Sequence, residues 1–210
     1  MKIAVIGTGN VGGILGARWS EVGHEVTFGT RDPASPKVKS LLKLTENKAR
    51  AASVLDAVSS SEVMVLATPL KAARDAIAVA GDLIGKILVD CTNPIGEGPD
   101  GKTMGAGKSA GEQVAEWARG ARVVKAFNTT GSNNMADPAY GDHKATMFIC
   151  GDDTAAKAVV SKLAAELGFE VCDGGRLSTA RLLESLAMLW IHLAYSQGLG
   201  REIAIALLKR

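Results

Sequence analysis

Short apolar runs alternate with longer stretches of mixed polarity along most of the chain. The run KIAVIG, for example, is continuously apolar and ends in glycine, which is typical of a strand buried on both faces of a parallel sheet. Strands are expected in this way at 2–7, 24–29, 62–69, 86–94, 122–131, 144–151 and 169–175, with a weaker one at 49–53. Helices are expected between them, at 10–23, 70–85, 109–118 and 153–168, with a short helix or turn at 56–61.

The alternation of strands and helices predicts the α/β class with a doubly wound, mainly parallel sheet. From residue 177 onward the sequence has the character of helix to the end, with a break at Gly198 and Gly200. We therefore expect one α/β domain at 1–173 and a small C-terminal helical extension at 174–210.

Gly7, Gly9 and Gly12 form the pattern G-x-G-x-x-G between the first expected strand and the first expected helix. Alone the pattern also fits a flexible turn, but this context is typical of a dinucleotide-binding loop. Gly7 would permit the tight turn, Gly9 the approach of a pyrophosphate, and Gly12 the close packing of helix on strand. The helix amides would then hold the anion.

The end of the second expected strand indicates which dinucleotide is bound. An NAD site usually carries a carboxylate there, whereas this strand runs into Gly29, Thr30 and Arg31. Gly29 would leave space, Thr30 offers a hydroxyl, and Arg31 offers a planar cation suited to a 2′-phosphate. Asp32 precedes a proline and is expected to face its own turn. Lys37 would add a second cation to this phosphate site. The alternative is that both cations are solvated surface residues. Because of the position of Arg31 we favour NADP(H) over NAD(H).

Ligands of open α/β sheets lie outside the carboxyl ends of the strands. The candidate residues there are small, polar or proline: Thr68, Pro69, Leu70, Asn93, Pro94, Asn128 and Thr129. Arg74 would reach the cofactor or face solvent. None of these segments supplies a general acid or base, so positioning would carry most of the catalysis. Asn128 and Thr129 are expected on the cleft floor, where Asn128 would orient the nicotinamide or the acceptor; the alternative is an asparagine that satisfies a local turn.

Composition excludes several other classes of protein. The chain is 47% apolar and 22% charged with a net charge of +2, so we expect no nucleic-acid partner. No apolar stretch reaches the roughly 20 residues that span a bilayer, and no signal peptide is expected. The three cysteines and three histidines are scattered, so we expect no metal site and reduced thiols in a cytoplasmic protein.

The stretch 182–193 is apolar well beyond one helical face. Its apolar positions are Leu182, Leu183, Leu186, Ala187, Met188, Leu189, Trp190, Ile191 and Leu193. A helix of this kind is normally covered on most sides. In a chain of this length a second copy would supply the cover through a twofold interface, so we predict a homodimer.

Segments along almost the whole chain together resemble the NADPH-dependent oxidoreductases typified by the NADP reductase of coenzyme F420, a 5-deazaflavin. They are IGTGNVGG, GHEVTFGTRD, LATP, VVKAFNTTG, CGDD and DGGRLSTARLLESL. The KAFN stretch also resembles the NADPH-oxidising domain of the membrane metalloreductases. The resemblance implies a Rossmann domain with a small C-terminal helical part, usually dimeric.

The resemblance also implies roles for particular residues. The pyrophosphate would be bound by Thr8, Gly9, Asn10 and Val11, and the rest of the NADP path would be lined by Leu70, Arg74, Asn93 and Ser132. The acceptor ring would lie near Asn128 and Thr129, covered by the segment after Gly174. The implied activity is hydride transfer between NADP(H) and a flavin-like acceptor such as F420 or FMN. Reduction of a small carbonyl or imine, or an NADP(H) sensor without turnover, stays open.

Overall fold

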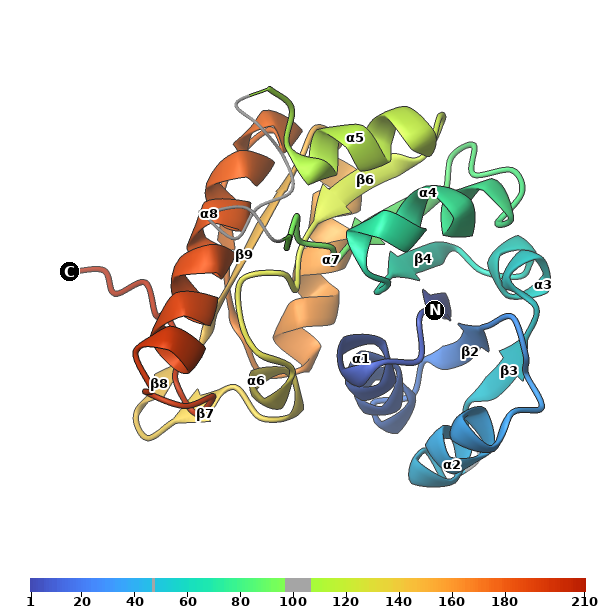
Figure 1. Ribbon diagram of the computed structural model, residues 1–210, viewed down its shortest axis with the longest axis horizontal. Coiled ribbons are helices and arrows are strands. Elements are labelled where there is room, and N and C mark those ends of the chain that lie inside the picture. The colour runs from blue at the N-terminus through green and yellow to red at the C-terminus, as the bar shows by residue number, and fades with distance from the viewer. Residues whose placement is uncertain (47, 97–106) are drawn as a thin grey trace.

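The computed structural model describes residues 1–46, 48–96 and 107–210. Its centre is an eight-stranded sheet in the order β10-β9-β6-β5-β4-β1-β2-β3 (Figure 1). The strands are β1 (Lys2–Ile6), β2 (Glu25–Gly29), β3 (Arg50–Ala52), β4 (Val63–Leu66), β5 (Ile87–Asp90), β6 (Arg122–Lys125), β9 (Thr146–Gly151) and β10 (Glu170–Asp173). Every neighbouring pair is parallel except β6 and β9, which confirms the mainly parallel sheet.

Helices cover both faces of the sheet, as in a doubly wound fold. They are α1 (Asn10–Glu21), α2 (Pro36–Leu44), α3 (Val54–Ser59), α4 (Leu70–Ala78), α5 (Ala110–Trp117), α6 (Ser132–Ala136), α7 (Thr154–Glu166) and α8 (Ala180–Ile191). Alternate strand residues point to opposite faces, so Ile3 and Val5 pack with α1 and α7 while Ala4 and Ile6 pack with α3, α4 and α5. The fold is therefore the expected Rossmann-type α/β architecture.

Several elements differ from the sequence-based expectation. The pattern did not predict α2 or α6, nor the two-stranded hairpin of β7 (Ala139–Tyr140) and β8 (His143–Lys144). The helix expected at 70–85 ends at Ala78, because Gly81 and Gly85 adopt positive φ angles that a helix does not accommodate.

The C-terminal extension is helical only in its first part, so the expectation of helix to residue 210 was wrong. Beyond α8 a π-helical turn covers His192–Ser196, and Gly198 and Gly200, both with positive φ, end it. Residues 201–207 then run as an extended strap along the protein. The Ile205 carbonyl accepts a bond from the Thr146 amide at 2.9 Å, and the Leu207 amide donates to Thr146 Oγ1 at 2.9 Å.

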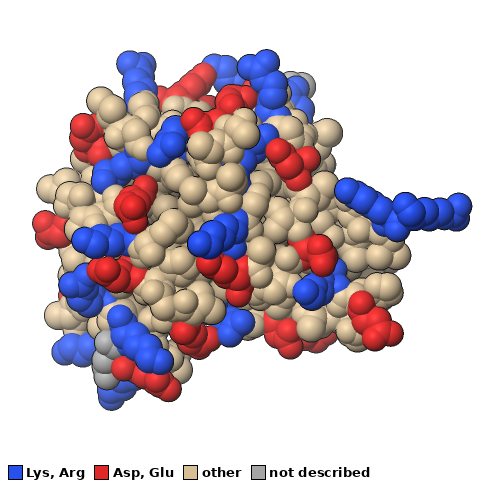
Figure 2. Space-filling view, turned by 180° about the vertical axis from the view of Figure 1, so that it is seen from behind, with Lys and Arg blue, Asp and Glu red and all other residues tan. Residues whose placement is uncertain are grey.

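The surface carries both signs of charge. On the face shown in Figure 2, Lys and Arg are interspersed with Asp and Glu rather than gathered into a region of one sign. Among the described helices, none combines the length and the apolar character that crossing a bilayer requires.

Candidate functional site

A groove with a volume of about 940 Å³ opens outside the carboxyl ends of β1, β4 and β5. This is the edge at which open α/β sheets bind their ligands. The groove is lined by Gly9, Asn10, Val11, Ala67, Thr68, Pro69, Leu70, Lys71, Arg74, Cys91, Thr92, Asn93, Ile95, Gln113 and Trp117.

The groove unites many of the residues expected at the site. Its wall includes Gly9, Asn10, Val11, Thr68, Pro69, Leu70, Arg74 and Asn93. Three further expected residues, Thr30, Arg31 and Lys37, follow the end of β2, which pairs with β1. Pro94 is buried behind the wall.

The turn between β1 and α1 has the geometry that its glycines suggest. Gly7 has a φ of +118°, and a Cβ there would lie 2.4 Å from the Ala67 carbonyl oxygen. At Gly12 a Cβ would lie 2.0 Å from the Gly7 carbonyl oxygen, so any side chain would separate helix and turn. A Cβ on Gly9, by contrast, would meet nothing within 4 Å. The protein thus packs against two of these glycines and leaves the third facing open space.

The end of β2 presents cations to solvent. Arg31 and Lys37 are exposed, and neither has an ion-pair partner among the described residues. Asp32 faces its own turn as expected, because its Oδ1 accepts a bond from the Ala34 amide at 3.0 Å. At Gly29 a Cβ would lie 2.4 Å from Ile6 Cδ1, so the packing of the core by itself requires a glycine at this position.

Two asparagines connect the ends of β5 and β6. Asn93 Nδ2 donates to the Asn128 carbonyl at 2.8 Å, and Asn128 Nδ2 donates to Asn93 Oδ1 at 3.0 Å. Asn93 lines the groove, whereas Asn128 and Thr129 are buried, at 4% and 3% exposure, and lie behind it. The structure therefore places Asn93, rather than Asn128 and Thr129, on the groove wall.

Polar atoms at these strand ends have no partner among the described residues. They are Thr68 Oγ1, Thr92 Oγ1, Asn128 Oδ1 and Thr129 Oγ1. Buried polar atoms are normally hydrogen-bonded, and exceptions gather at functional sites. The residue before Asn128 is also unusual, since Phe127 has a φ of +59°, a strained conformation for a bulky side chain. Its ring packs edge-on against Trp19 at 5.5 Å, which holds the strained turn in place.

Ser132 lies away from the groove wall. It is buried, and its hydroxyl accepts a bond from the Arg201 guanidinium of the strap at 2.9 Å. The neighbouring Asn134 donates to the Ile203 carbonyl at 2.7 Å. The strap therefore fixes the loop after β6, and the structure gives Ser132 a place in that contact.

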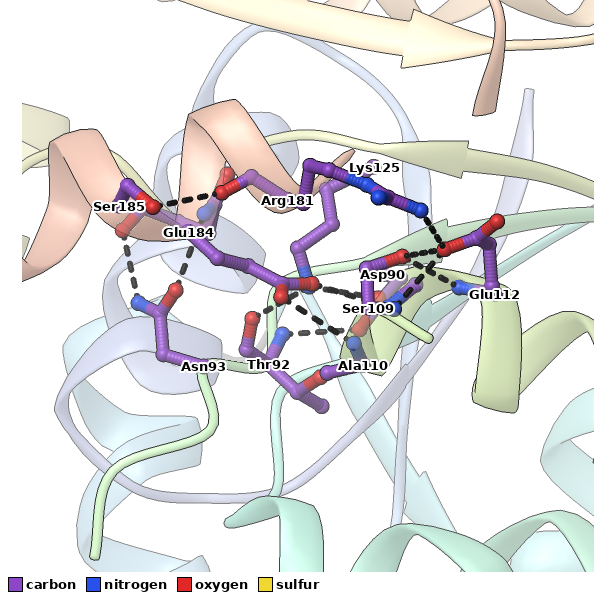
Figure 3. Close-up of polar contacts among 12 residues, drawn as sticks. Asp90, Thr92, Asn93, Ser109, Ala110, Glu112, Lys125, Arg181, Glu184 and Ser185 are labelled. Carbon is purple, nitrogen blue, oxygen red and sulfur yellow. Dashed lines mark hydrogen bonds and ion pairs between the residues drawn. The ribbon is translucent and has the colours of Figure 1, made fainter. Parts of the chain in front are cut away.

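A cluster of buried charges lies behind the groove (Figure 3). Lys125 Nζ lies 2.8 Å from Asp90 Oδ2 and 3.1 Å from Glu184 Oε1, and it donates to the Thr92 carbonyl at 2.7 Å. Burial favours the neutral amine, but the two carboxylates outweigh it and raise the pKa of Lys125. Sequence reasoning missed this cluster, although a lysine inside the apolar run RVVKAF was a visible signal.

The ionisable side chains on the described wall are Lys71, Arg74 and Cys91. Lys71 and Arg74 are exposed cations on α4, and burial raises the pKa of the Cys91 thiol far above its usual range, with the Asp90 carboxylate adding to the effect. Sequence reasoning also missed the α5 side of the wall, Gln113 and Trp117. The described wall thus offers hydrogen bonds, positive charge and a protonated thiol, and it includes no carboxylate, histidine or tyrosine.

Comparison with known proteins agrees with this geometry. The model of the family "NADP oxidoreductase coenzyme F420-dependent" matches residues 2–94. The F420-dependent NADP reductase of Methanothermobacter thermautotrophicus is 32% identical over 210 residues, covering 92% of this chain and 89% of that protein. Metalloreductase STEAP3 of Rattus norvegicus is 31% identical over 188 residues. That match covers 89% of this chain but only 36% of the metalloreductase.

Solved structures give the same result. A crystal structure from Arthrobacter sp. FB24, described as a candidate F420-dependent NADP reductase, superposes with a TM-score of 0.88 at 36% identity over the whole of both chains. A reductive aminase from Aspergillus terreus in complex with NADPH has a TM-score of 0.69 at 22% identity over 94% of this chain and 62% of the aminase, which shows a shared fold alone. This chain therefore belongs to the coenzyme F420-dependent NADP oxidoreductase family and is an NADP(H)-binding oxidoreductase.

Proposed function

We propose that this protein transfers hydride between NADP(H) and a flavin-like ring, such as the deazaflavin F420, FMN or a similar acceptor. The observation that carries the proposal is the described groove wall, which has polar and cationic groups but no carboxylate, histidine or tyrosine, and whose one thiol, Cys91, is held protonated by burial. Reduction of a carbonyl needs a proton donor beside the new alkoxide, whereas transfer between two rings depends mainly on their alignment. When bound, the nicotinamide supplies or accepts the hydride.

The residues present fit NADP(H). Gly9 faces open space at the start of α1, whose first turn has no side-chain cap, so its amides are free for an anion. The half-buried Thr30 and the exposed Arg31 after β2, with the exposed Lys37 at the start of α2, suit a 2′-phosphate. On this proposal Thr68, Pro69, Leu70 and Arg74 line the cofactor path, and the orphaned hydroxyls of Thr68 and Thr92 gain partners from the ligand.

The asparagine pair would set the orientation of the rings. Asn93 reaches the groove wall, and Asn128 fixes it from behind through two hydrogen bonds. A neutral amide donates and accepts hydrogen bonds but does not supply a proton, so the role of both residues is positional. We further propose that residues 174–210 act as a C-terminal cover of the acceptor side, distinct from the nucleotide-binding domain at 1–173.

A panel of acceptors tests the proposal. Purified protein is mixed with NADPH and, separately, with F420, FMN, a quinone, a small ketone and a cyclic imine, and loss of NADPH absorbance is followed. We expect turnover with at least one flavin-like ring and a much lower rate with the ketone and the imine. Turnover with the ketone or the imine alone would refute the proposal and indicate a carbonyl or imine reductase. NADPH binding without turnover on any acceptor would indicate a sensor.

We also propose that the protein is a homodimer through α8. The chain itself covers Leu183, Ala187 and Trp190 on the inner face, but Leu182 and Leu189 on the outer face are 64% and 50% exposed. Tyr195, just beyond the helix, is exposed as well. Exposed apolar residues gathered on one helix mark an interface. Light scattering at micromolar concentration should give a dimer mass, and Leu189→Lys should shift it to the monomer; a monomeric parent protein would remove the proposal.

A further inference from the structure

Three charged side chains, those of Asp90, Lys125 and Glu184, form a buried cluster. The side chains of Lys125 and Asp90 are 0% exposed and that of Glu184 is 5% exposed. Removing three charges from water is costly, and an apolar set of similar volume is often as stable. Such a cluster is therefore weak evidence for a role in stability, and the groups it contacts indicate another role.

Lys125 holds one wall of the groove. Its ammonium donates to the Thr92 carbonyl at 2.7 Å, while Asp90 Oδ1 accepts the Thr92 amide at 2.9 Å. Both backbone groups of Thr92 are thus bound by the cluster. Thr92 and the next residue, Asn93, line the groove, so the position of this wall depends on the buried ammonium.

Glu184 holds a second part of the wall. Its Oε2 accepts the Ala110 amide at 3.1 Å and its Oε1 accepts the Gly111 amide at 3.0 Å, at the first turn of α5 (Figure 3). A carboxylate at a helix N-terminus is favoured by the helix dipole. The same helix supplies Gln113 and Trp117 to the groove. One carboxylate of α8 therefore touches both the helix that forms one wall and the lysine that fixes the other.

The junction is closely packed at Gly111. A Cβ on Gly111 would lie 2.9 Å from Ala180 Cβ and 3.2 Å from Lys125 Cδ. Glycine is therefore needed here for α5 to approach both β6 and α8, and a single methyl group would displace one wall without removing a charge.

We propose that Lys125 and Glu184 are positioning residues that set the width of the nicotinamide end of the groove and tie it to the C-terminal helix. This rests on the proposed function, because it takes the β5 end of the groove as the nicotinamide end. Neither residue lines the described groove, so they would act through Thr92, Asn93 and α5.

The test compares two ligands that differ only at the nicotinamide. NADPH and 2′-phospho-ADP-ribose are titrated by calorimetry into the parent protein and into Glu184→Gln, Lys125→Met and Gly111→Ala. We expect the affinity for NADPH to fall about tenfold, equivalent to about 1.4 kcal/mol, while that for 2′-phospho-ADP-ribose stays within about twofold. The conservative Glu184→Asp should recover part of the loss.

Lys157→Met is the matched control. Lys157 also binds a carboxylate and a carbonyl, Asp173 Oδ2 at 2.7 Å and the Gly175 oxygen at 3.3 Å, but none of these residues lines the groove. This variant should bind both ligands as the parent does.

The proposal would be overturned if a variant lost equal affinity for the two ligands. It would also be overturned if a variant kept its affinity for NADPH while its melting temperature fell, since the cluster would then be only structural. If Lys125→Met does not fold, the other two variants test the proposal. Glu184→Gln keeps the lysine paired with Asp90, and Gly111→Ala keeps every charge. A parent protein that binds neither ligand would refute the proposed function itself, which is a different outcome.

Discussion

Beside the ends of β1 and β2 the groups available to a ligand are the uncapped backbone amides of α1 and exposed cations. Beside the ends of β5 and β6 the groove wall is formed by Thr92 and Asn93, which are held in place from behind by buried charges and by Asn128. The first region is formed by the turn between β1 and α1 and by the residues that follow β2. The second needs β5, β6, α5 and α8 together. Exposed side chains can be replaced at little cost to the stability of the protein, whereas side chains that are fixed by buried contacts cannot. Substitutions in the two regions should therefore differ in how strongly they lower the melting temperature.

The largest effect should come from the glycine turn, where substitutions at Gly12 and Gly9 should both weaken NADPH binding but differ in their effect on stability. Gly12→Ala places a methyl group 2.0 Å from a backbone oxygen, so we expect a stability loss of about 3 kcal/mol or more and loss of NADPH binding. Gly9→Ala meets no protein atom and should melt within about 2 °C of the parent, yet bind NADPH at least about tenfold more weakly. Thermal unfolding and calorimetry measure both; full NADPH affinity in Gly9→Ala would exclude this loop as the pyrophosphate site.

Arg31→Ala should give the next largest effect and should act on binding alone. A charged hydrogen bond to phosphate contributes about 1.5–3 kcal/mol, so NADPH affinity should fall roughly tenfold to a hundredfold with NADH affinity unchanged. The melting temperature should not move, because Arg31 is exposed. Lys39→Ala, which removes an exposed cation on the nearby helix α2, is the control for general charge. Equal losses for the two nucleotides would show that Arg31 does not bind the 2′-phosphate.

Asn128→Ala should slow turnover by about tenfold while NADPH affinity stays within about threefold. The affinity is expected to hold because the backbone carbonyl of residue 128 still accepts from Asn93. The rate should fall because Asn93 Oδ1 loses its donor and the wall loses rigidity. Stopped-flow hydride transfer measures the step directly, and its pH profile should be the same as that of the parent. An unchanged single-turnover rate with every competent acceptor would make Asn128 part of the scaffold.

The smallest effect concerns the thiols. Burial raises the pKa of Cys150 to about 12 and that of Cys91 higher still, so both remain protonated at pH 8 and at pH 9 and react slowly with iodoacetamide, which attacks the thiolate. The half-buried Cys172 should be labelled first, with NADPH binding unaffected. Mass spectrometry of digested protein gives the order. Rapid labelling of Cys91 would mean that the β5–β6 end opens in solution and that the contrast between the two ends is smaller than the structure indicates.

The β1–β2 end could be predicted from sequence because its determinants are local. Gly12 packs against the carbonyl of Gly7, five residues before it, and Asp32 turns back because Pro33 and Ala34 follow. The contacts of Gly7 with Ala67 and of Gly29 with Ile6 are between segments that are distant in the chain, and only the folded structure shows them.

The β5–β6 end could not be predicted in the same way, because its contacts join segments that are distant in the chain. Lys125 and Glu184 were each visible as a charge among apolar residues, but nothing local pairs them. The sequence pattern predicts helix for the strap because the spacing of its apolar residues fits a helix as well as a strand. In the structure its backbone instead forms hydrogen bonds with Thr146, which is distant in the chain.

The antiparallel seam between β6 and β9 has a consequence for folding. It is paired through Val124 with Gly151 and Lys125 with Cys150, so in a chain in which β9 had not yet docked β6 would be the open edge of the sheet. In such a chain Lys125 would also lack the carboxylate of Glu184 and would be open to water. A charged lysine on an exposed strand discourages edge-to-edge association between chains. The same side chain that is buried at the end of folding would therefore protect the incomplete sheet from aggregation while the C-terminal part is still being assembled.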